Sequence, residues 1–297
     1  MLKRIPWMLV FLALAAATEA ADEALTYRGG PAPWWWDQGF WNDGTLAVPE
    51  NHPVKIAWAE YKAGDATVPV MVARPADGGK YPAVLYSHGR RGLDDLVQLQ
   101  VKRLAARGFV VAAPDVFKGR FMDIFPIEHD YVLEDDMSAG VDYLLARTDV
   151  STTKACLASH TRGGYTTLKV AVTKKRQDRD VVCYVSWYPH MQDPNAPEPM
   201  QVYRYAAEAD ALKIPVMIFI GENEQYQRKR GIEEAVKAMR ARNHPVTLVE
   251  YPGVGRGFDF RSPPDAPRTF ADDLANKDAV QRAALFMRKH LEAFEKR

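Results

Sequence analysis

From residue 54 onward, short apolar segments alternate with longer segments whose apolar residues recur every three or four positions. The short segments, rich in Val and Ile, predict strands at 54–61, 67–75, 81–89, 109–115, 154–160, 181–188, 214–222 and 245–253. The longer segments predict helices at 93–107, 132–148, 163–175, 230–242 and 277–296. In the first helix Leu93, Val97, Val101 and Leu104 share one face, and Gly108 marks the end.

Strands that are apolar on both faces and separated by helices form a mostly parallel sheet that helices cover on both sides. The sequence therefore predicts one α/β domain over residues 54–297, and it shows no internal repeat or flexible linker. Ligands of such sheets bind beyond the carboxyl ends of the strands. The residues that follow each predicted strand are therefore the first candidates for a functional site.

The first twenty residues, MLKRIPWMLVFLALAAATEA, have two basic residues, an apolar run from Ile5 to Ala17 and small residues at the end. This pattern is typical of a secretory signal peptide, cleaved after Ala20 or Ala21. The alternative is an uncleaved anchor, but the run is short for a membrane span. We expect a mature protein that is periplasmic or secreted and no longer attached to a membrane.

Residues 21–53 show no periodicity and include APWWWDQGFWNDG, which places four tryptophans within eight residues. One hypothesis is an arm that packs its rings on the surface of the domain. The other is an aromatic lid or a platform on which sugars stack.

The composition is that of a globular protein, with 47% hydrophobic and 26% charged residues among 297. The formal net charge is +1, and loss of residues 1–20 removes two basic residues and one acidic residue, which brings it to zero. A neutral protein favours a small-molecule ligand over nucleic acid. No motif indicates a cofactor, and no HxH or HExxH spacing indicates a metal site.

Two cysteines, Cys156 and Cys183, both fall inside predicted strands. The interpretation we favour is a pair of buried free thiols. The alternative is a single disulfide in an exported protein.

The segment Ser159-His160-Thr161-Arg162-Gly163 joins a predicted strand to a predicted helix. Small residues two positions before and after a central hydroxyl residue are typical of a nucleophile elbow, a sharp turn that projects its central residue above the sheet. Thr161 occupies the nucleophile position of this pattern.

The order of SHTRGGY, IPVMIFIGENE and YPGVGRGFDF resembles the dienelactone hydrolase family of the α/β-hydrolase fold, over about residues 54–295. The resemblance implies hydrolysis of small esters or lactones by a nucleophile, an acid and a base. These positions hold Thr161, Glu224 and Arg256 here, where the family has Cys, Asp and His. Gly89 stands where many members have a glutamate after the first histidine.

The three replacements change the chemistry of the site. Arg256 has no lone pair with which to accept a proton, and a β-branched Thr161 adds to the ~1–3 kcal/mol cost of a strained elbow. Glu224 and Arg256 are instead suited to a forked ion pair. His190, after the sixth strand, is a substitute base in one hypothesis and an ordinary loop residue in the other.

Backbone N–H groups still predict an oxyanion hole, formed by Arg162 with Gly89 or Arg90. Further ligand-binding candidates at the same edge are His88, Arg91, Arg120 and His160. Arg120 lies one residue out of register with the family's carboxylate-binding arginine. Local packing is the alternative role for His88 and His160, and solvent exposure is the alternative for each arginine.

Two functional hypotheses follow. The first is an exported hydrolase of small esters or lactones, in which Thr161 works through an unusual partner. The second is a non-catalytic member that binds a small carboxylate in the pocket or serves as a partner of another periplasmic enzyme. The missing base at Arg256 favours the second hypothesis.

Overall fold

The computed structural model describes residues 52–260 and 269–296. The predicted signal peptide at 1–20 and almost all of the Trp-rich segment at 21–53 lie outside the described residues. The hypotheses about those two segments stay predictions.

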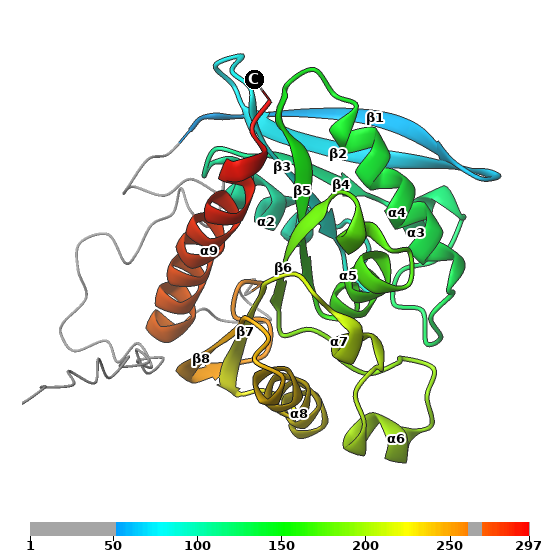
Figure 1. Cartoon of the computed structure of the whole chain (residues 1–297), viewed down its shortest axis with the longest axis vertical. Helices are drawn as coiled ribbons and strands as arrows, with labels where there is room; N and C mark the ends of the chain where they lie inside the picture. Colours follow the sequence, from blue (N-terminus) through cyan, green and yellow to red (C-terminus); the bar gives the residue numbers. More distant parts are fainter. Residues whose placement is uncertain (1–51, 261–268, 297) are drawn as a thin grey trace, which may run out of the picture.

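The described chain contains an eight-stranded sheet in the order β1-β2-β4-β3-β5-β6-β7-β8 (Figure 1). The strands are β1 (Val54–Ala63), β2 (Ala66–Pro75), β3 (Tyr81–Ser87), β4 (Val110–Pro114), β5 (Val150–His160), β6 (Val181–Trp187), β7 (Val216–Asn223) and β8 (Val246–Gly255). β2 runs antiparallel to β1 and β4, and the other neighbouring pairs are parallel. Each strand coincides with a predicted segment, and the mostly parallel sheet is confirmed.

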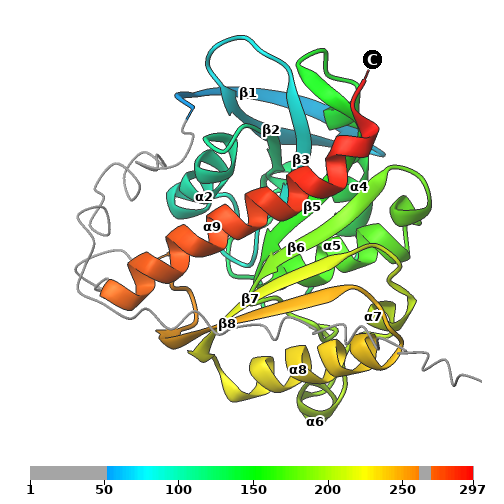
Figure 2. The same ribbon diagram turned by 60° about the vertical axis from the view of Figure 1, so that its left-hand side comes forward.

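Helices cover both faces of this sheet. They are α2 (Asp95–Ala105), α3 (Val116–Gly119), α4 (Val132–Leu145), α5 (Arg162–Val172), α6 (Glu198–Tyr203), α7 (Glu208–Ala211), α8 (Tyr226–Ala241) and α9 (Phe270–Leu291), with short 3-10 turns at Arg176–Asp178 and Glu292–Phe294. α2 and α9 lie on one face, and α4, α5 and α8 lie on the other (Figures 1 and 2). The apolar residues predicted for α2 are buried, as a helix packed on a sheet requires.

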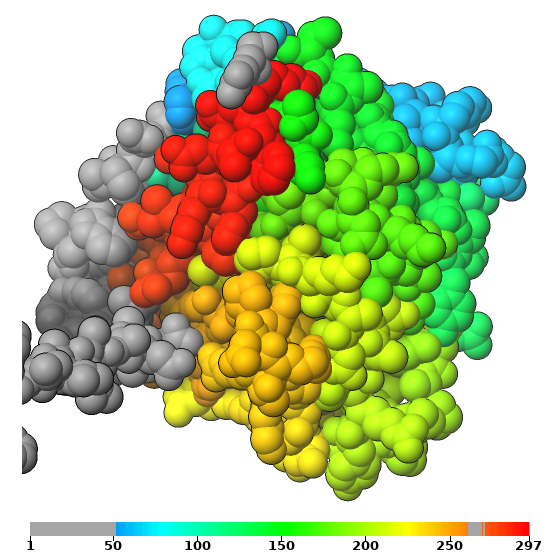
Figure 3. All heavy atoms as spheres, in the orientation of Figure 1, coloured from blue at the N-terminus to red at the C-terminus, as the bar shows by residue number. Residues whose placement is uncertain are grey.

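Several helix boundaries differ from the prediction. α9 begins at Phe270 rather than at 277, because Thr269 and Asp272 form a capping box at its start. α8 begins at Tyr226 rather than at 230. The short helices α3, α6 and α7 were not predicted, since four to six residues are too few to show a helical period. α6 forms a projection at one end of the molecule (Figure 3).

The favoured interpretation of the cysteines was wrong. Cys156 and Cys183 form a disulfide that joins β5 to β6, at positions that pair directly across the two parallel strands. Their Cα atoms lie 4.7 Å apart, within the range that a disulfide spans. Hydrophobic periodicity places each cysteine on a strand, but it does not give the register between strands.

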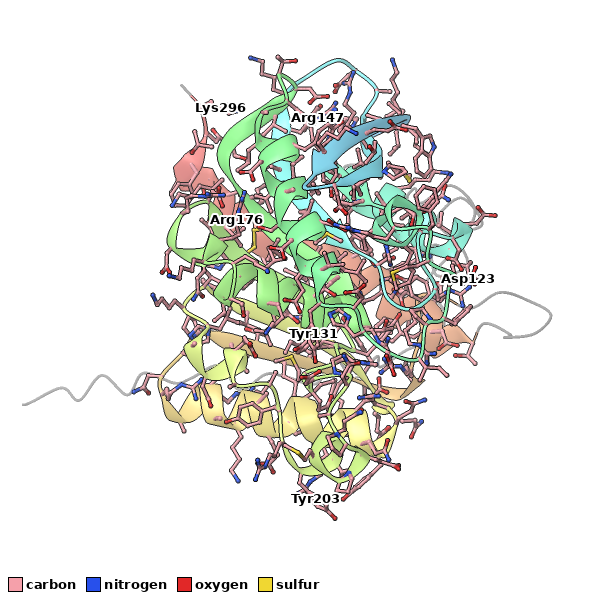
Figure 4. The ribbon with its side chains drawn as sticks, turned by 90° about the vertical axis from the view of Figure 1, so that its right-hand side faces the viewer. Asp123, Tyr131, Arg147, Arg176, Tyr203 and Lys296 are labelled. Carbon is pink, nitrogen blue, oxygen red and sulfur yellow. A yellow bond between two sulfur atoms is a disulfide. The ribbon has the colours of Figure 1, made fainter. Side chains whose placement is uncertain are left out.

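The carboxyl ends of the parallel strands share one end of the molecule. In Figure 4, Tyr131 and Tyr203 lie toward this end, whereas Arg147 and Lys296 lie toward the other, where β5 begins. Among the described residues, no helix has the length and apolar character needed to cross a membrane.

Candidate functional site

Thr161 forms a sharp turn between β5 and α5, with φ 48° and ψ −123°. Its N–H donates to the Trp187 carbonyl at 3.1 Å, and its carbonyl accepts from the N–H of His190 at 2.7 Å. A Cβ added to Gly163 would lie 2.4 Å from the Ser87 carbonyl, and one on Gly164 would lie 2.3 Å from a Pro189 carbon. These contacts require glycine, so the sequence supports the elbow geometry although its central residue is threonine.

Gly89 packs against the elbow from the loop after β3. A Cβ at this position would lie 1.8 Å from Thr161 Oγ1, so no larger residue fits beside the hydroxyl. The N–H of Gly89 donates to His160 Nε2 at 3.2 Å. The structure therefore places this N–H in a side-chain hydrogen bond rather than in an open oxyanion hole. Arg162 and Arg90 are the remaining backbone candidates, and Arg162 is the first residue of α5, where N–H groups have no partner within the helix.

His160 is fully buried beside the elbow. Its Nδ1 lies 3.0 Å from the Tyr86 hydroxyl, and its Nε2 accepts from Gly89. Burial, followed by the charges of nearby basic groups, holds the pKa of His160 well below its usual value. The ring is therefore neutral and carries its proton on Nδ1. It supports the elbow from within the protein, which corresponds to the packing alternative.

Glu224 and Arg256 form an ion pair between the end of β7 and the residue after β8, but through one contact rather than the predicted fork, since Glu224 Oε2 is buried without a partner among the described residues. Arg256 Nη1 donates to Glu224 Oε1 at 2.8 Å, and the two side chains are 18% and 0% exposed. The Gln225 N–H donates to the same oxygen at 2.8 Å. The Arg256 guanidinium also lies 5.0 Å from the centre of the Tyr188 ring. The acid and base positions are thus adjacent and joined by an ion pair, in which Arg256 has no lone pair with which to accept a proton.

His190 follows β6 and is 6% exposed. Its Nδ1 is buried and has no hydrogen-bond partner among the described residues. Burial, and then the positive charges of Arg228, Arg256, Arg162 and Arg90, hold the pKa of His190 well below its usual value. A general base works best with a pKa near the operating pH, so this ring is a weak substitute.

All seven histidines of the sequence fall within residues 52–260 and 269–296. In those two ranges, no histidine ring forms a hydrogen bond with the Thr161 hydroxyl.

The side chains of Arg90 and Arg162 hold the loop that follows α3. Arg90 Nε and Arg162 Nη1 both donate to the Pro126 carbonyl, at 2.8 and 3.1 Å. Further donors of the two guanidiniums reach the carbonyls of Phe125, Ile127 and Glu128. Burial, and then the positive charges of Arg90 and Arg228, lower the pKa of Arg162 to about 10. Arg162 therefore remains cationic at neutral pH and brings its charge to the edge of the site.

The structure gives two other candidate arginines acidic partners. Arg91 Nε donates to Asp94 at 2.8 Å, at the start of α2. Arg120 donates two hydrogen bonds to Asp136, each 2.7 Å long, and a third, also 2.7 Å long, to Asp65. Arg120, a predicted ligand-binding residue, is engaged by these carboxylates between the β1–β2 turn and α4, and its binding role stays a prediction.

His88 lies beside a small cavity of about 10 Å³, room for about one water molecule. Its Nδ1 donates to the Gly89 carbonyl at 2.8 Å, and its buried Nε2 has no partner among the described residues. Burial lowers the pKa of His88. His129, whose ring lies 3.3 Å from Glu134, is on another wall of this cavity and was not among the sequence candidates.

Arg228 is the main site residue that the sequence argument missed. It lies in the first turn of α8, in a part of the helix that the prediction had left as loop. Its Nη1 donates to Gln192 at 3.4 Å and to Gln201 at 3.3 Å. Its closeness in sequence to Glu224, which stands two residues before the start of α8, was the available signal.

In the two described ranges, no group of three or more His, Cys, Asp or Glu side chains could hold a metal ion. Positive charge reaches this edge of the sheet through Arg90, Arg162 and Arg256. Arginines at such an edge are suited to binding a negatively charged or strongly polarised oxygen.

Several solved structures share this fold. A putative dienelactone hydrolase from Klebsiella pneumoniae has a TM-score of 0.63 at 18% identity, over 80% of this chain and 99% of that one. A dienelactone hydrolase-like promiscuous phosphotriesterase from metagenomic libraries has a TM-score of 0.61 at 16% identity, over 80% and 98% of the two chains. These similarities confirm the α/β-hydrolase fold.

The model of the dienelactone hydrolase family matches residues 68–291. This chain therefore belongs to the dienelactone hydrolase family. A putative carboxymethylenebutenolidase from Methylorubrum extorquens is 25% identical over 212 residues, which cover 66% of this chain and 70% of the relative. Chlorophyllase type 0 from Chenopodium album is 27% identical over 134 residues, and this chain spans only 37% of its length.

Proposed function

We propose that this protein is an exported member of the dienelactone hydrolase family that binds small carboxylates at its elbow and hydrolyses esters weakly or not at all. The observation that carries the proposal is the ion pair between Arg256 and Glu224 in the base and acid positions. An arginine held there has no lone pair with which to accept a proton and offers only donors. The site is therefore suited to receiving an anion rather than to removing a proton from Thr161.

The oxyanion-binding half of the hydrolase machinery supports this binding role. The first N–H groups of α5 point out of the helix at the elbow, and the helix dipole favours a negative charge there. The arginines around His190 add positive charge at the same edge. A carboxylate has the charge and the two acceptor oxygens that such donors bind.

Export is the second part of the proposal. The disulfide between Cys156 and Cys183 supports it, because disulfides persist in oxidising compartments. The basic and apolar start of the sequence gives independent support. Expression of the full chain in a Gram-negative host tests the point, with a periplasmic product that begins after Ala20 or Ala21 as the expected result and a full-length cytoplasmic product as the contrary one.

A second candidate function is hydrolysis of small esters or lactones by Thr161. The strained backbone of the elbow favours it, since Thr161 keeps a positive φ that a purely structural turn does not need. The Methylorubrum relative, a putative carboxymethylenebutenolidase, is consistent with such a substrate class.

Chromogenic esters and a small lactone distinguish the two functions. The parent protein is expected to remain far below ~1 per second, the low end of ordinary enzyme rates, and Thr161→Ala to change the residual rate only a few-fold. The double variant Thr161→Cys with Arg256→His places an activatable thiol beside an imidazole and a carboxylate, so it should gain hydrolysis. Each single variant serves as a control. A parent rate typical of enzymes that falls ~100-fold or more in Thr161→Ala would favour the hydrolase instead.

A further inference from the structure

The loop of residues 121–131, between α3 and α4, exposes large apolar side chains to solvent; Asp123 marks this loop in Figure 4. Four such side chains fall within seven consecutive residues, and we call them the apolar loop face. They are Phe121, which is fully exposed, Ile127, which is 86% exposed, and Ile124 and Phe125, each at least half exposed. Single exposed apolar residues are ordinary on a protein surface, whereas a group of them marks an interaction site.

Hydrogen bonds hold the backbone of this loop in place. The Phe125 N–H donates to the Arg90 carbonyl at 2.6 Å. The guanidiniums of Arg90 and Arg162 donate to the carbonyls of residues 125–128. Phe121 and Phe125 have φ of 55° and 60°, in the left-handed region where a bulky residue is strained. A backbone held in strained conformations, with its apolar side chains in water, indicates a surface that another group covers.

The chain that precedes His52 is within reach of this face. The His52 N–H donates to the Ala106 carbonyl at 3.0 Å, at the C-terminal end of α2. The face lies at the other end of that helix, since a Cβ on Gly92 would lie 2.9 Å from Ile124 Cγ2. At 1.5 Å per residue, Gly92 and Ala106 are about 20 Å apart. Trp41 precedes His52 by eleven residues, which span up to about 36 Å when extended.

We propose that the apolar loop face is the docking surface of the tryptophan-rich segment at residues 33–41, which precedes the described residues. This segment reads PWWWDQGFW and offers five aromatic side chains, which bury large apolar areas on contact. Because the segment is tethered to the domain, its contact with the face is intramolecular and has the high effective concentration that a linker provides. The inference concerns a surface of the domain and does not depend on the proposed function.

Two other occupants fit the face less well. The loop carries Asp123, Glu128 and Asp130 and no Lys or Arg from 121 to 131, so an anionic lipid surface would repel it. A second copy of the chain lacks the tether, so it would have to bind from solution at its own free concentration. The covalently linked aromatic segment is therefore the favoured occupant.

Docking on this face places the segment beside the elbow. Arg162 follows Thr161 directly, and its guanidinium donates to the carbonyls of residues 126–128. The aromatic rings of residues 33–41 would then line one side of the approach to Thr161.

Photo-cross-linking tests the contact directly. The photoreactive analogue p-benzoylphenylalanine can replace Phe121 without disturbing the core, because that side chain is fully exposed. On irradiation of the purified, dilute protein, we expect a link within one chain to residues 33–41, identified by peptide mass spectrometry. The same analogue at Tyr226, an exposed aromatic residue at the start of α8, should not link to that segment. Links between two chains, links confined to residues 52–297, or equal linking from both positions would overturn the inference.

Tryptophan fluorescence gives a second measurement on variants without the analogue. In the double variant Phe121→Ser with Ile127→Ser, the acrylamide quenching constant should rise about two-fold, because four of the six tryptophans after residue 20 lie in the segment and lose their apolar contact. Tyr226→Ser, which also removes an exposed aromatic ring, should leave the constant unchanged. Equal quenching in the parent and the double variant would overturn the inference, and carboxylate binding at the elbow would be unaffected by that result.

Discussion

The ion pair between Glu224 and Arg256 predicts a strong energetic coupling. Glu224→Gln removes the acidic charge with little change in shape, and Arg256→Met removes the guanidinium but keeps most of the stem. If the pair replaces the acid and base of a triad, removing either residue alone should strongly reduce the free energy of unfolding. Removing it after its partner is gone should reduce that free energy much less.

The magnitudes follow from burial. Arg256→Met leaves the fully buried Glu224 side chain with one remaining hydrogen bond, from the Gln225 N–H. Loss of one partner of a buried pair costs about 3–5 kcal/mol, and relief of the repulsion between Arg256 and Arg228 places the value near the lower end. Glu224→Gln leaves no buried carboxylate, and Arg256 keeps partial solvent access and the Tyr188 ring, so about 1–3 kcal/mol is expected.

Urea unfolding of the parent, the two single variants and the double variant measures the coupling. The free energy of unfolding of the double variant should fall by about as much as that of Glu224→Gln, plus a small packing cost. The coupling energy between Glu224 and Arg256 is then about 2 kcal/mol. In melting experiments, Arg256→Met should lower Tm by about 6–12 °C, at about 3 kcal/mol and about 2–4 °C per kcal/mol for a domain of this size. If the losses of unfolding free energy in the two single variants add up to that of the double variant within ~0.5 kcal/mol, the two residues are not coupled and the pairing is refuted.

Two further predictions concern the core and the pH response. Replacing Cys156 and Cys183 with alanine reopens a loop with a sequence separation of 27 residues, so it should cost about 3.5 kcal/mol in the chain-entropy model; a parent whose intact mass does not change on reduction would contradict the disulfide. Because the pKa of His190 is depressed in the folded protein, below about pH 6.5 the unfolded chain binds a proton that the folded ring does not bind. The free energy of unfolding therefore falls as the pH falls. His190→Gln should reduce that slope by up to about 1.4 kcal/mol per pH unit in urea unfolding, and equal slopes in parent and variant would reject the argument.

The sequence alone predicted the features that depend on local pattern. Apolar segments of strand length located all eight strands, and the small residues around Thr161 located the elbow. The order of three motifs placed Glu224 and Arg256 next to each other, because the loops after neighbouring parallel strands meet at one edge. Their opposite charges then predicted the ion pair.

Features that depend on register or on side-chain direction were not predictable in the same way. The disulfide requires Cys156 and Cys183 to be opposite each other across β5 and β6, and a one-residue shift would have separated them. Arg120 donates a hydrogen bond to Asp136, which lies in a helix farther along the chain, and the sequence pattern does not give the direction of its side chain. Arg228 was missed because intrinsic patterns locate helix boundaries poorly, and α8 begins earlier than its apolar periodicity suggests.

Anion binding and proton abstraction make opposite demands on this site. A base beside Thr161 must accept a proton and become cationic during the reaction. His190 is surrounded by Arg228, Arg256, Arg162 and Arg90, so protonation would add a fifth positive charge to a cluster that is partly removed from water. The same positive charges lower the energy of a bound carboxylate. Under the proposed function, an elbow that keeps its backbone shape without a histidine base retains one function of a hydrolase site, the stabilisation of an oxyanion. That function depends on N–H groups and fixed charge rather than on a titrating side chain.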